Sequence, residues 1–122
     1  MKPTNQNIQP KVMTEYQPGA ILEDQWGWEQ TNVDFYCIIS RKGDFVTLLP
    51  MKKTTSKEIG FMTNEETPAL INWDAKPIRK KIYKSRENWQ LGKELGFSFR
   101  NYTGGGWCRL WDGKPSLSTH YA

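Results

Sequence analysis

The chain has 122 residues with a net charge of +4, and 37% of its residues are apolar. This length suits one domain with a small core, to which the many tryptophan, tyrosine and phenylalanine side chains can contribute. No apolar run approaches the roughly 20 residues that span a bilayer, and the polar start shows no signal-peptide segment. The sequence therefore predicts a cytoplasmic protein and excludes a membrane partner.

The charge is unevenly distributed along the chain. Residues 1–75 carry seven basic and ten acidic residues, a net −3, whereas residues 76–100 carry eight basic and two acidic residues, a net +6. Such asymmetry favours one basic face and an anionic partner. A run of charge is also typical of a solvated surface, so both interpretations stay open.

The first predicted element is a flexible N-terminal arm over residues 1–17, which are polar and show no hydrophobic period. Pro18 and Gly19 then mark the entry to a single β domain over residues 18–122. Residues 20–26, AILEDQW, are expected to form its first strand.

The clearest strand pattern is VDFYCIIS, residues 33–40, in which every second residue is apolar. The side chains expected on its buried face are Val33, Phe35, Cys37 and Ile39. Gly43 can take a positive φ in the turn that follows, so residues 33–51 predict a β-hairpin. Pro50 cannot donate to a ladder, which places it at a strand end or an edge.

The middle of the chain has a weaker pattern. Residues 52–75 mix polar and scattered apolar residues, which predicts a long loop or an irregular excursion, with a loop signal at residues 64–67 and Trp73 as an anchor for its return. Residues 76–85 then predict a strand. Its Ile78 and Ile82 would lie on one face, opposite Arg79, Lys81 and Tyr83.

The last third alternates turns and short strands. Residues 86–96 suit one helical turn or a hairpin connection, and residues 97–102 predict a strand with Phe97 and Phe99 inward. The three glycines at 104–106 predict a loop, because they cost too much entropy inside a strand. Residues 107–111 predict a last core strand. Asp112 and Gly113 then give a hairpin signal, with residues 116–122 pairing back.

Five to seven short strands separated by turns predict an all-β or β-dominated fold. We expect a small antiparallel, partly open barrel or a strongly bent sheet. The side chains expected in its core are Ile21, Trp26, Phe35, Cys37, Ile39, Val46, Leu48, Ile82, Phe97, Phe99, Leu110 and Trp111.

The basic strand and the residues after it form the first candidate site. Basic side chains neutralise phosphates and aromatic rings stack on bases, so this composition favours a nucleic-acid-binding surface. The alternative is an edge strand whose lysines block edge-to-edge aggregation. The candidate nucleic-acid-binding residues are Lys76, Arg79, Lys80, Lys81, Tyr83, Lys84, Arg86 and Trp89.

The second candidate site is a recognition loop within WGWEQTN. Gly27 permits a bend between the two tryptophans, and Asn32 can close an Asx-turn before the next strand. The polar residues between them either bond to their own backbone or recognise base edges beside a stacking ring. The residues of this candidate recognition loop are Trp28, Glu29, Gln30, Thr31 and Asn32.

The sequence predicts no cofactor and no metal site, because Cys37, Cys108 and the single His120 lack the spacing of ligand pairs. Both thiols are expected to be reduced and to lie in or near the core. A small enzyme with an acidic site near Glu29 and Asp34 remains an alternative, since metal-dependent nucleases use clustered carboxylates. No catalytic residue is assigned.

The segments WGWEQTNVDFY and LWDGKP with its terminal YA resemble a family of small proteins encoded by bacteria, phages and other mobile elements. Family members carry tyrosine where this chain has Trp28. The resemblance implies a bacterial or phage setting, a shared small fold, and a joint role for the two ends of the domain. It implies no catalytic residue.

These observations favour a non-enzymatic binding module that contacts nucleic acid or another polyanion through the basic strand. An alternative is a protein-binding factor of a phage or mobile element, for example one that inhibits a host enzyme. That alternative predicts a large exposed aromatic patch with a few dominant contact residues. The oligomeric state is left open.

Overall fold

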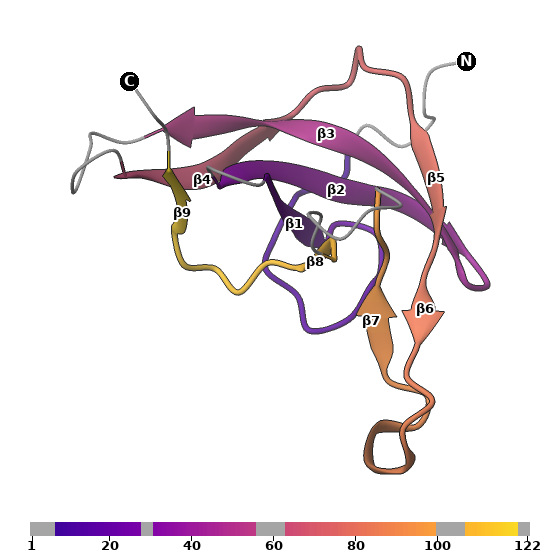
Figure 1. The fold of residues 1–122 in the computed structure, drawn as a ribbon. Coiled ribbons are helices and arrows are strands. Elements are labelled where there is room, and N and C mark those ends of the chain that lie inside the picture. Colours follow the sequence, from indigo (N-terminus) through magenta and orange to yellow (C-terminus); the bar gives the residue numbers. More distant parts are fainter. Residues whose placement is uncertain (1–6, 28–30, 56–62, 100–106, 120–122) are drawn as a thin grey trace.

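The computed structural model describes residues 7–27, 31–55, 63–99 and 107–119, and it shows a curled antiparallel sheet with a small hairpin beside it (Figure 1). The elements are β1 (Ile21–Trp26), β2 (Asn32–Lys42), β3 (Phe45–Thr55), β4 (Thr63–Ile71), β5 (Ile78–Lys81), β6 (Tyr83–Lys84), the 3-10 turn η1 (Asn88–Gln90), β7 (Glu94–Gly96), β8 (Arg109–Leu110) and β9 (Ser116–Thr119). The predicted β-dominated, strongly bent antiparallel architecture is confirmed.

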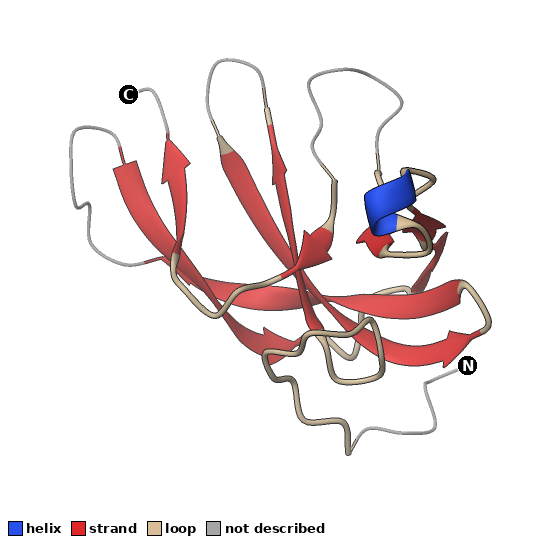
Figure 2. Cartoon of the chain, turned by 90° about the horizontal axis from the view of Figure 1, so that it is seen from below, coloured by secondary structure: helices blue, strands red, loops and turns tan. Residues whose placement is uncertain are grey.

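The main sheet has the strand order β8-β1-β2-β3-β4-β9, and β5 pairs with β3 beside this path. Among the described strands, β6 and β7 pair only with each other, and they extend away from the main sheet (Figure 1). From below, the strands of the main sheet cross one another as the sheet curls (Figure 2). Among the described residues, no helix is long and apolar enough to cross a membrane.

The centre of the sheet is the predicted β2–β3 hairpin. Its turn closes where Lys42 pairs with Phe45, and Gly43 takes a φ of 60° there, which glycine adopts without the strain a Cβ brings. The register shifts by one residue between Ile38 and Ser40, which marks a β-bulge. Alternation along β2 is as predicted, but both of its faces are covered.

Each face of the sheet carries one apolar cluster. The first cluster contains Tyr16, Ala20, Leu22, Ile38, Val46, Leu48, Ile82, Phe97 and Cys108. The second contains Ile21, Val33, Phe35, Cys37, Ile39, Leu49, Met51 and Ile71. Four of the predicted core residues are only partly buried: Trp26, Phe99, Leu110 and Trp111. The prediction missed Leu22 and Leu49, because it assumed that each strand buries a single face.

The loop predicted over residues 52–75 is wrong. Strand β3 continues to Thr55, and β4 occupies Thr63–Ile71, including the supposed loop signal at residues 64–67. The polar side chains are satisfied inside the sheet: Glu66 is 4% exposed and accepts hydrogen bonds from Thr55 Oγ1 (2.7 Å) and Ser118 Oγ (3.0 Å). Buried polar groups with such partners carry little desolvation penalty. Trp73 does pack against the second cluster, as predicted.

Pro50 does not end its strand. It pairs with Tyr36 of β2 on one side, and on the other side β3 changes neighbour at this point. Strand β5 pairs with β3 up to Leu48, and β4 begins to pair at Met51. A proline is tolerated there because no strand requires its missing N–H, while its carbonyl accepts the Asn72 N–H at 2.9 Å.

Three further local predictions are corrected. The basic segment forms two short strands in different sheets, β5 and β6, with the buried Ile82 between them. The strand predicted at residues 97–102 is misplaced, since β7 ends at Gly96 and Phe97 forms only an isolated bridge with Cys108. Residues 100–102 lie outside the described residues.

The hairpin predicted at Asp112 and Gly113 is also wrong. The turn exists, and the Lys114 N–H donates to Asp112 Oδ1 at 2.9 Å. However, β8 pairs with β1 and β9 pairs with β4, so this turn connects opposite edges of the curled sheet. A turn signal in a sequence does not specify which strands pair across it.

The segment before Pro18 contributes to the core. Tyr16 is 5% exposed within the first cluster, and Lys11 forms a parallel bridge with Ala20. Core contacts therefore begin before the domain boundary expected at Pro18. The predicted triple-glycine loop at 104–106 and His120 lie outside the described residues.

Candidate nucleic-acid interface

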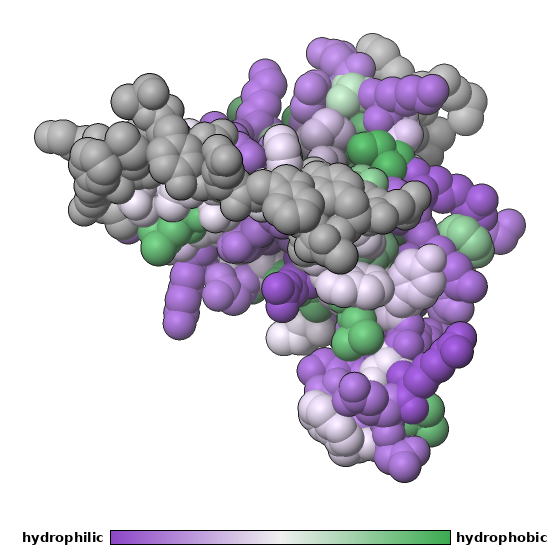
Figure 3. All heavy atoms as spheres, viewed as in Figure 1, coloured by the Kyte–Doolittle hydropathy of each residue, from purple (hydrophilic) through white to green (hydrophobic). Residues whose placement is uncertain are grey.

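The basic segment lies along one margin of the molecule. Strands β5 and β6 follow one another there (Figure 1), and hydrophilic side chains gather along the same margin (Figure 3). Within the described part of the chain, β5 pairs only with β3 and is an edge strand. Lysines at such an edge can block edge-to-edge aggregation. Whether they also form a binding surface depends on the arrangement of the individual side chains.

Strand register assembles a compact basic group on one face of the sheet. Lys42 pairs with Phe45 across the β2–β3 turn, and Phe45 pairs with Lys81 of β5. Residues paired in this way project to the same face. Arg79 joins them, because its guanidinium lies 4.1 Å from the centroid of the Phe45 ring. We call Lys42, Phe45, Arg79 and Lys81 the basic face.

The cations of the basic face have no carboxylate partner among the described residues: the ion pairs found there involve Arg41, Lys53 and Lys84 instead. All three cations are exposed, and Phe45 is 37% exposed. Unpaired positive charge beside an exposed ring is the chemistry that binds phosphates and bases. Sequence reasoning missed Lys42 and Phe45, which pair across the turn of the β2–β3 hairpin.

Lys80 does not belong to this face. It projects to the opposite side of β5, where its ammonium lies 5.0 Å from the Phe99 ring centroid and donates to the Ser98 carbonyl at 3.4 Å. Its side chain covers the rim of the first cluster while the charged end reaches polar partners. Lys76 is exposed and precedes β5.

A groove continues from the basic face to the β6–β7 hairpin. It has a volume of about 410 Å³ and is lined by residues 81–86 together with Asp44, Leu91 and Gly92. Lys84 pairs with Asp44 at 3.1 Å, whereas Arg86 is exposed. The groove therefore joins Lys81 to the predicted binding residues of β6.

Tyr83 lines this groove, and its ring packs against Trp107. It is 53% exposed, and its ring meets Trp107 edge to face, with centroids 5.7 Å apart and planes at 79°. Such contacts fix ring orientation and contribute about 0.5–1.5 kcal/mol beyond area burial. Trp107 was not predicted as a site residue, and nothing in the local sequence pairs it with Tyr83.

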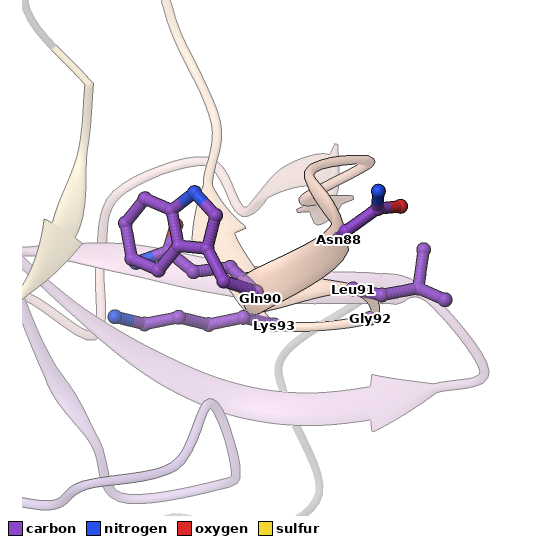
Figure 4. Close-up of a pocket in the computed structure, with 6 residues that line it drawn as sticks. Asn88, Gln90, Leu91, Gly92 and Lys93 are labelled. Carbon is purple, nitrogen blue, oxygen red and sulfur yellow. The ribbon is translucent and has the colours of Figure 1, made fainter.

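The tip of the hairpin is exposed and contains apolar side chains. Trp89 is 78% and Leu91 is 75% exposed. Residues 88–93 line an open hollow of about 730 Å³, in which Leu91 and Lys93 point in opposite directions (Figure 4). Exposed apolar side chains are typical of protein-binding surfaces. The alternative function, binding of a protein partner, stays a prediction.

Arg41 holds this hairpin against the main sheet. Its guanidinium donates to both carboxylate oxygens of Glu94, to the Tyr16 carbonyl at 2.7 Å and to the Gly43 carbonyl at 2.8 Å. One side chain thus connects the N-terminal segment, the β2–β3 turn and β7. The Arg41 hydrogen bonds hold the pKa of Glu94 below its ordinary value of 4.5.

A lowered carboxylate pKa stabilises the folded state above the unfolded-state pKa, and this contribution is lost as the pH falls through the folded-state pKa. We expect Glu94→Gln to lower the free energy of unfolding at neutral pH by about 1–3 kcal/mol, and this loss to shrink as the pH falls below the ordinary carboxyl pKa of 4.5. Urea denaturation across this pH range measures both effects. Glu87→Gln, an exposed carboxylate on the same hairpin, is the control. An unchanged stability profile for Glu94→Gln would contradict the role given to Arg41.

The predicted recognition loop is only partly described, since Trp28, Glu29 and Gln30 lie outside the described residues. The Thr31 N–H donates to Thr119 Oγ1 of β9 at 2.7 Å, and the Thr119 N–H donates to the Thr31 carbonyl at 3.0 Å. Asn32 Nδ2 donates to the Trp26 carbonyl at 3.4 Å, across the loop rather than within an Asx-turn. Thr31 and Asn32 therefore bond within the protein.

The two segments that carry the family resemblance meet in space. Phe35 of the first segment and Trp111 of the second pack edge to face, with ring centroids 5.7 Å apart. Trp26 is not brought to the basic face, because β1 and β5 lie on opposite sides of the β2–β3 hairpin. Thr31 and Asn32, the described residues of the predicted recognition loop, bond to Thr119 and Trp26 and are not part of the basic face.

The groups considered for catalysis have local partners. Asp34 accepts a hydrogen bond from Trp26 Nε1 at 2.7 Å and lies 4.0 Å from Lys53 Nζ, while Glu29 lies outside the described residues. Neither Cys37 nor Cys108 forms a disulfide, and both are buried, as expected of core thiols. Burial raises the pKa of the Cys37 thiol to about 12, which keeps it neutral and unreactive. In the parts of the chain that are described, no group of three or more His, Cys, Asp or Glu residues is placed to hold a metal ion.

Comparison with protein-family models, curated proteins and solved structures gave no match to this chain. Functional inference therefore rests on the geometry of the basic face and the groove beside it.

Proposed function

We propose that the protein is a non-enzymatic module that binds nucleic acid or a related polyanion through the basic face. The observation that carries the proposal is the group of three cations, Lys42, Arg79 and Lys81, around the exposed Phe45. Three cations held together by strand pairing repel one another, and an anionic ligand relieves that repulsion.

The wider charge pattern supports the same proposal. Beyond the basic face, the exposed Lys84 and Arg86 line the adjoining groove, and only Asp44 among the residues lining that groove is acidic. Lysine and arginine contacts to phosphates displace condensed counterions, so such binding is independent of sequence and weakens steeply with salt.

We expect the protein to bind labelled oligonucleotides at low salt and to lose affinity as salt increases. Replacing two lysines of the basic face in a Lys42→Gln, Lys81→Gln variant should weaken binding and reduce the slope of log K against log salt by about 2. Fluorescence anisotropy at two or more salt concentrations measures both quantities.

The matched control changes charge by the same amount elsewhere. Lys52→Gln with Lys114→Gln alters two exposed lysines outside the basic face and should leave the slope close to that of the natural protein. Absence of salt-sensitive binding to any oligonucleotide, or equal effects of the two double variants, would overturn the proposal.

A further inference from the structure

We infer that the polyanion is a single-stranded nucleic acid whose unpaired bases stack on Arg79 and Tyr83. This inference rests on the proposed function and names the ligand class of the same site. It follows from the placement of two flat, supported side chains on either side of Lys81, at the point where the basic face passes into the groove.

Arg79, Lys81 and Tyr83 project from the same side of the chain. Ile82, between the last two, is 1% exposed and points into the first cluster, while Arg79, Lys81 and Tyr83 are all exposed. Residues two apart on an extended chain share a face. The site therefore alternates a planar cation, a point charge and an aromatic ring along one line.

Both flat groups are held in place before any ligand arrives. The Phe45 ring supports the Arg79 guanidinium at 4.1 Å, and Trp107 supports the Tyr83 ring at 5.7 Å. Guanidinium planes and tyrosine rings are the surfaces on which proteins stack unpaired bases. Groups that are already ordered lose less conformational entropy on binding.

The spacing of Arg79 and Tyr83 favours a single strand over a duplex as the ligand. Arg79 and Tyr83 are four residues apart on an extended chain, so their Cα atoms lie about 13 Å apart. In a duplex the bases stack on one another at about 3.4 Å along each strand, so their faces are covered and unavailable to both groups. A single strand can separate its bases and place its intervening phosphates near Lys81.

Three probes of equal length test this inference: labelled oligothymidine, the same strand paired with oligoadenine, and an abasic deoxyribose-phosphate strand. We expect oligothymidine to bind most tightly. Tyr83→Ala should weaken oligothymidine binding about 5- to 150-fold and leave binding of the abasic strand nearly unchanged. Tyr83→Phe, which keeps the ring, should retain affinity for oligothymidine.

Arg79→Lys separates stacking from charge, because lysine keeps the positive charge and loses the plane. It should weaken binding of oligothymidine but not of the abasic strand. Leu117→Ala, an exposed change on the distant β9, is the neutral control, and circular dichroism checks that each variant is folded.

The outcomes distinguish the two proposals. If oligothymidine and the abasic strand bind equally, or if the duplex binds more tightly, the stacking inference is overturned while the proposed polyanion function stands. If none of the three probes binds at low salt, the proposed function itself fails, and this inference fails with it.

Discussion

Gly96→Ala is expected to destabilise the protein by about 2–5 kcal/mol. Gly96 has a φ of 91°, a conformation that L side chains rarely adopt, and an added Cβ would overlap the backbone carbonyl of Cys108. It would also lie 3.1 Å from the Tyr16 hydroxyl. The neighbouring atom is backbone, so the clash cannot be relieved by a side-chain rotation.

This glycine matters for the site because it pairs with Tyr83 and precedes the Phe97–Cys108 bridge. That bridge brings the strand leading to β8, and Trp107 with it, beside the hairpin. Gly96→Ala is therefore expected to reduce oligonucleotide affinity in any fraction that still folds. Thermal unfolding and fluorescence anisotropy measure the two effects separately.

Gly43→Ala is the matched control for this prediction. Gly43 also has a positive φ, of 60°, but an added Cβ there meets no atom within 4 Å. Only the backbone strain of about 1–2 kcal/mol remains. If the two variants lose the same stability, close approach of the Cys108 carbonyl is not what requires glycine at position 96.

Phe35→Ala is expected to lower the free energy of unfolding by about 3–5 kcal/mol, the range for removing a large buried aromatic side chain. Phe35 is 1% exposed, lies in the second cluster and packs edge to face against Trp111. Truncation leaves a cavity that the surrounding sheet can close only in part, and it removes a contact between the two segments that carry the family resemblance.

Urea denaturation of Phe35→Ala measures this loss. Phe35→Leu should cost clearly less, since leucine refills part of the cavity. Because the second cluster lies at a distance from β6, oligonucleotide affinity at low denaturant should change little in folded protein. A loss of stability below about 1 kcal/mol would contradict the position of Phe35 at the centre of the cluster.

The candidate interface spans two structural units, and a few residues fix their relation. Strand β5 belongs to the main sheet and β6 to the small hairpin, so Arg79 and Tyr83 stand on different sheets. The Ile82 N–H donates to the Asp44 carbonyl at 2.7 Å, and Arg41 binds Glu94 of β7. These contacts set the distance between the two flat groups, so the geometry of the site depends on residues outside the basic face.

Where hydrophobic alternation and turn chemistry are local, the amino-acid pattern is enough to predict the structure. The β2–β3 hairpin follows from apolar residues at every second position of residues 33–39 and from a glycine where the turn needs positive φ. The burial of Ile78 and Ile82 against the first cluster follows from the same period. The β-dominated class and the exposure of Arg79, Lys81 and Tyr83 were predictable for this reason.

The pairing of distant strands and the contacts of each polar side chain follow from the folded sheet and not from any local pattern. The polar residues 64–67 predict a loop from sequence alone. In the structure they lie in β4, where Thr55 and Ser118 donate hydrogen bonds to the Glu66 carboxylate. The strand period places Lys80 on the face of Ile78 and Ile82, but only the structure shows that its ammonium lies over the Phe99 ring. Phe45 and Lys42 join the site through cross-strand register, and Trp107 through a contact with Tyr83. Pairing between strands far apart in sequence depends on the whole curled sheet, and no local pattern encodes it.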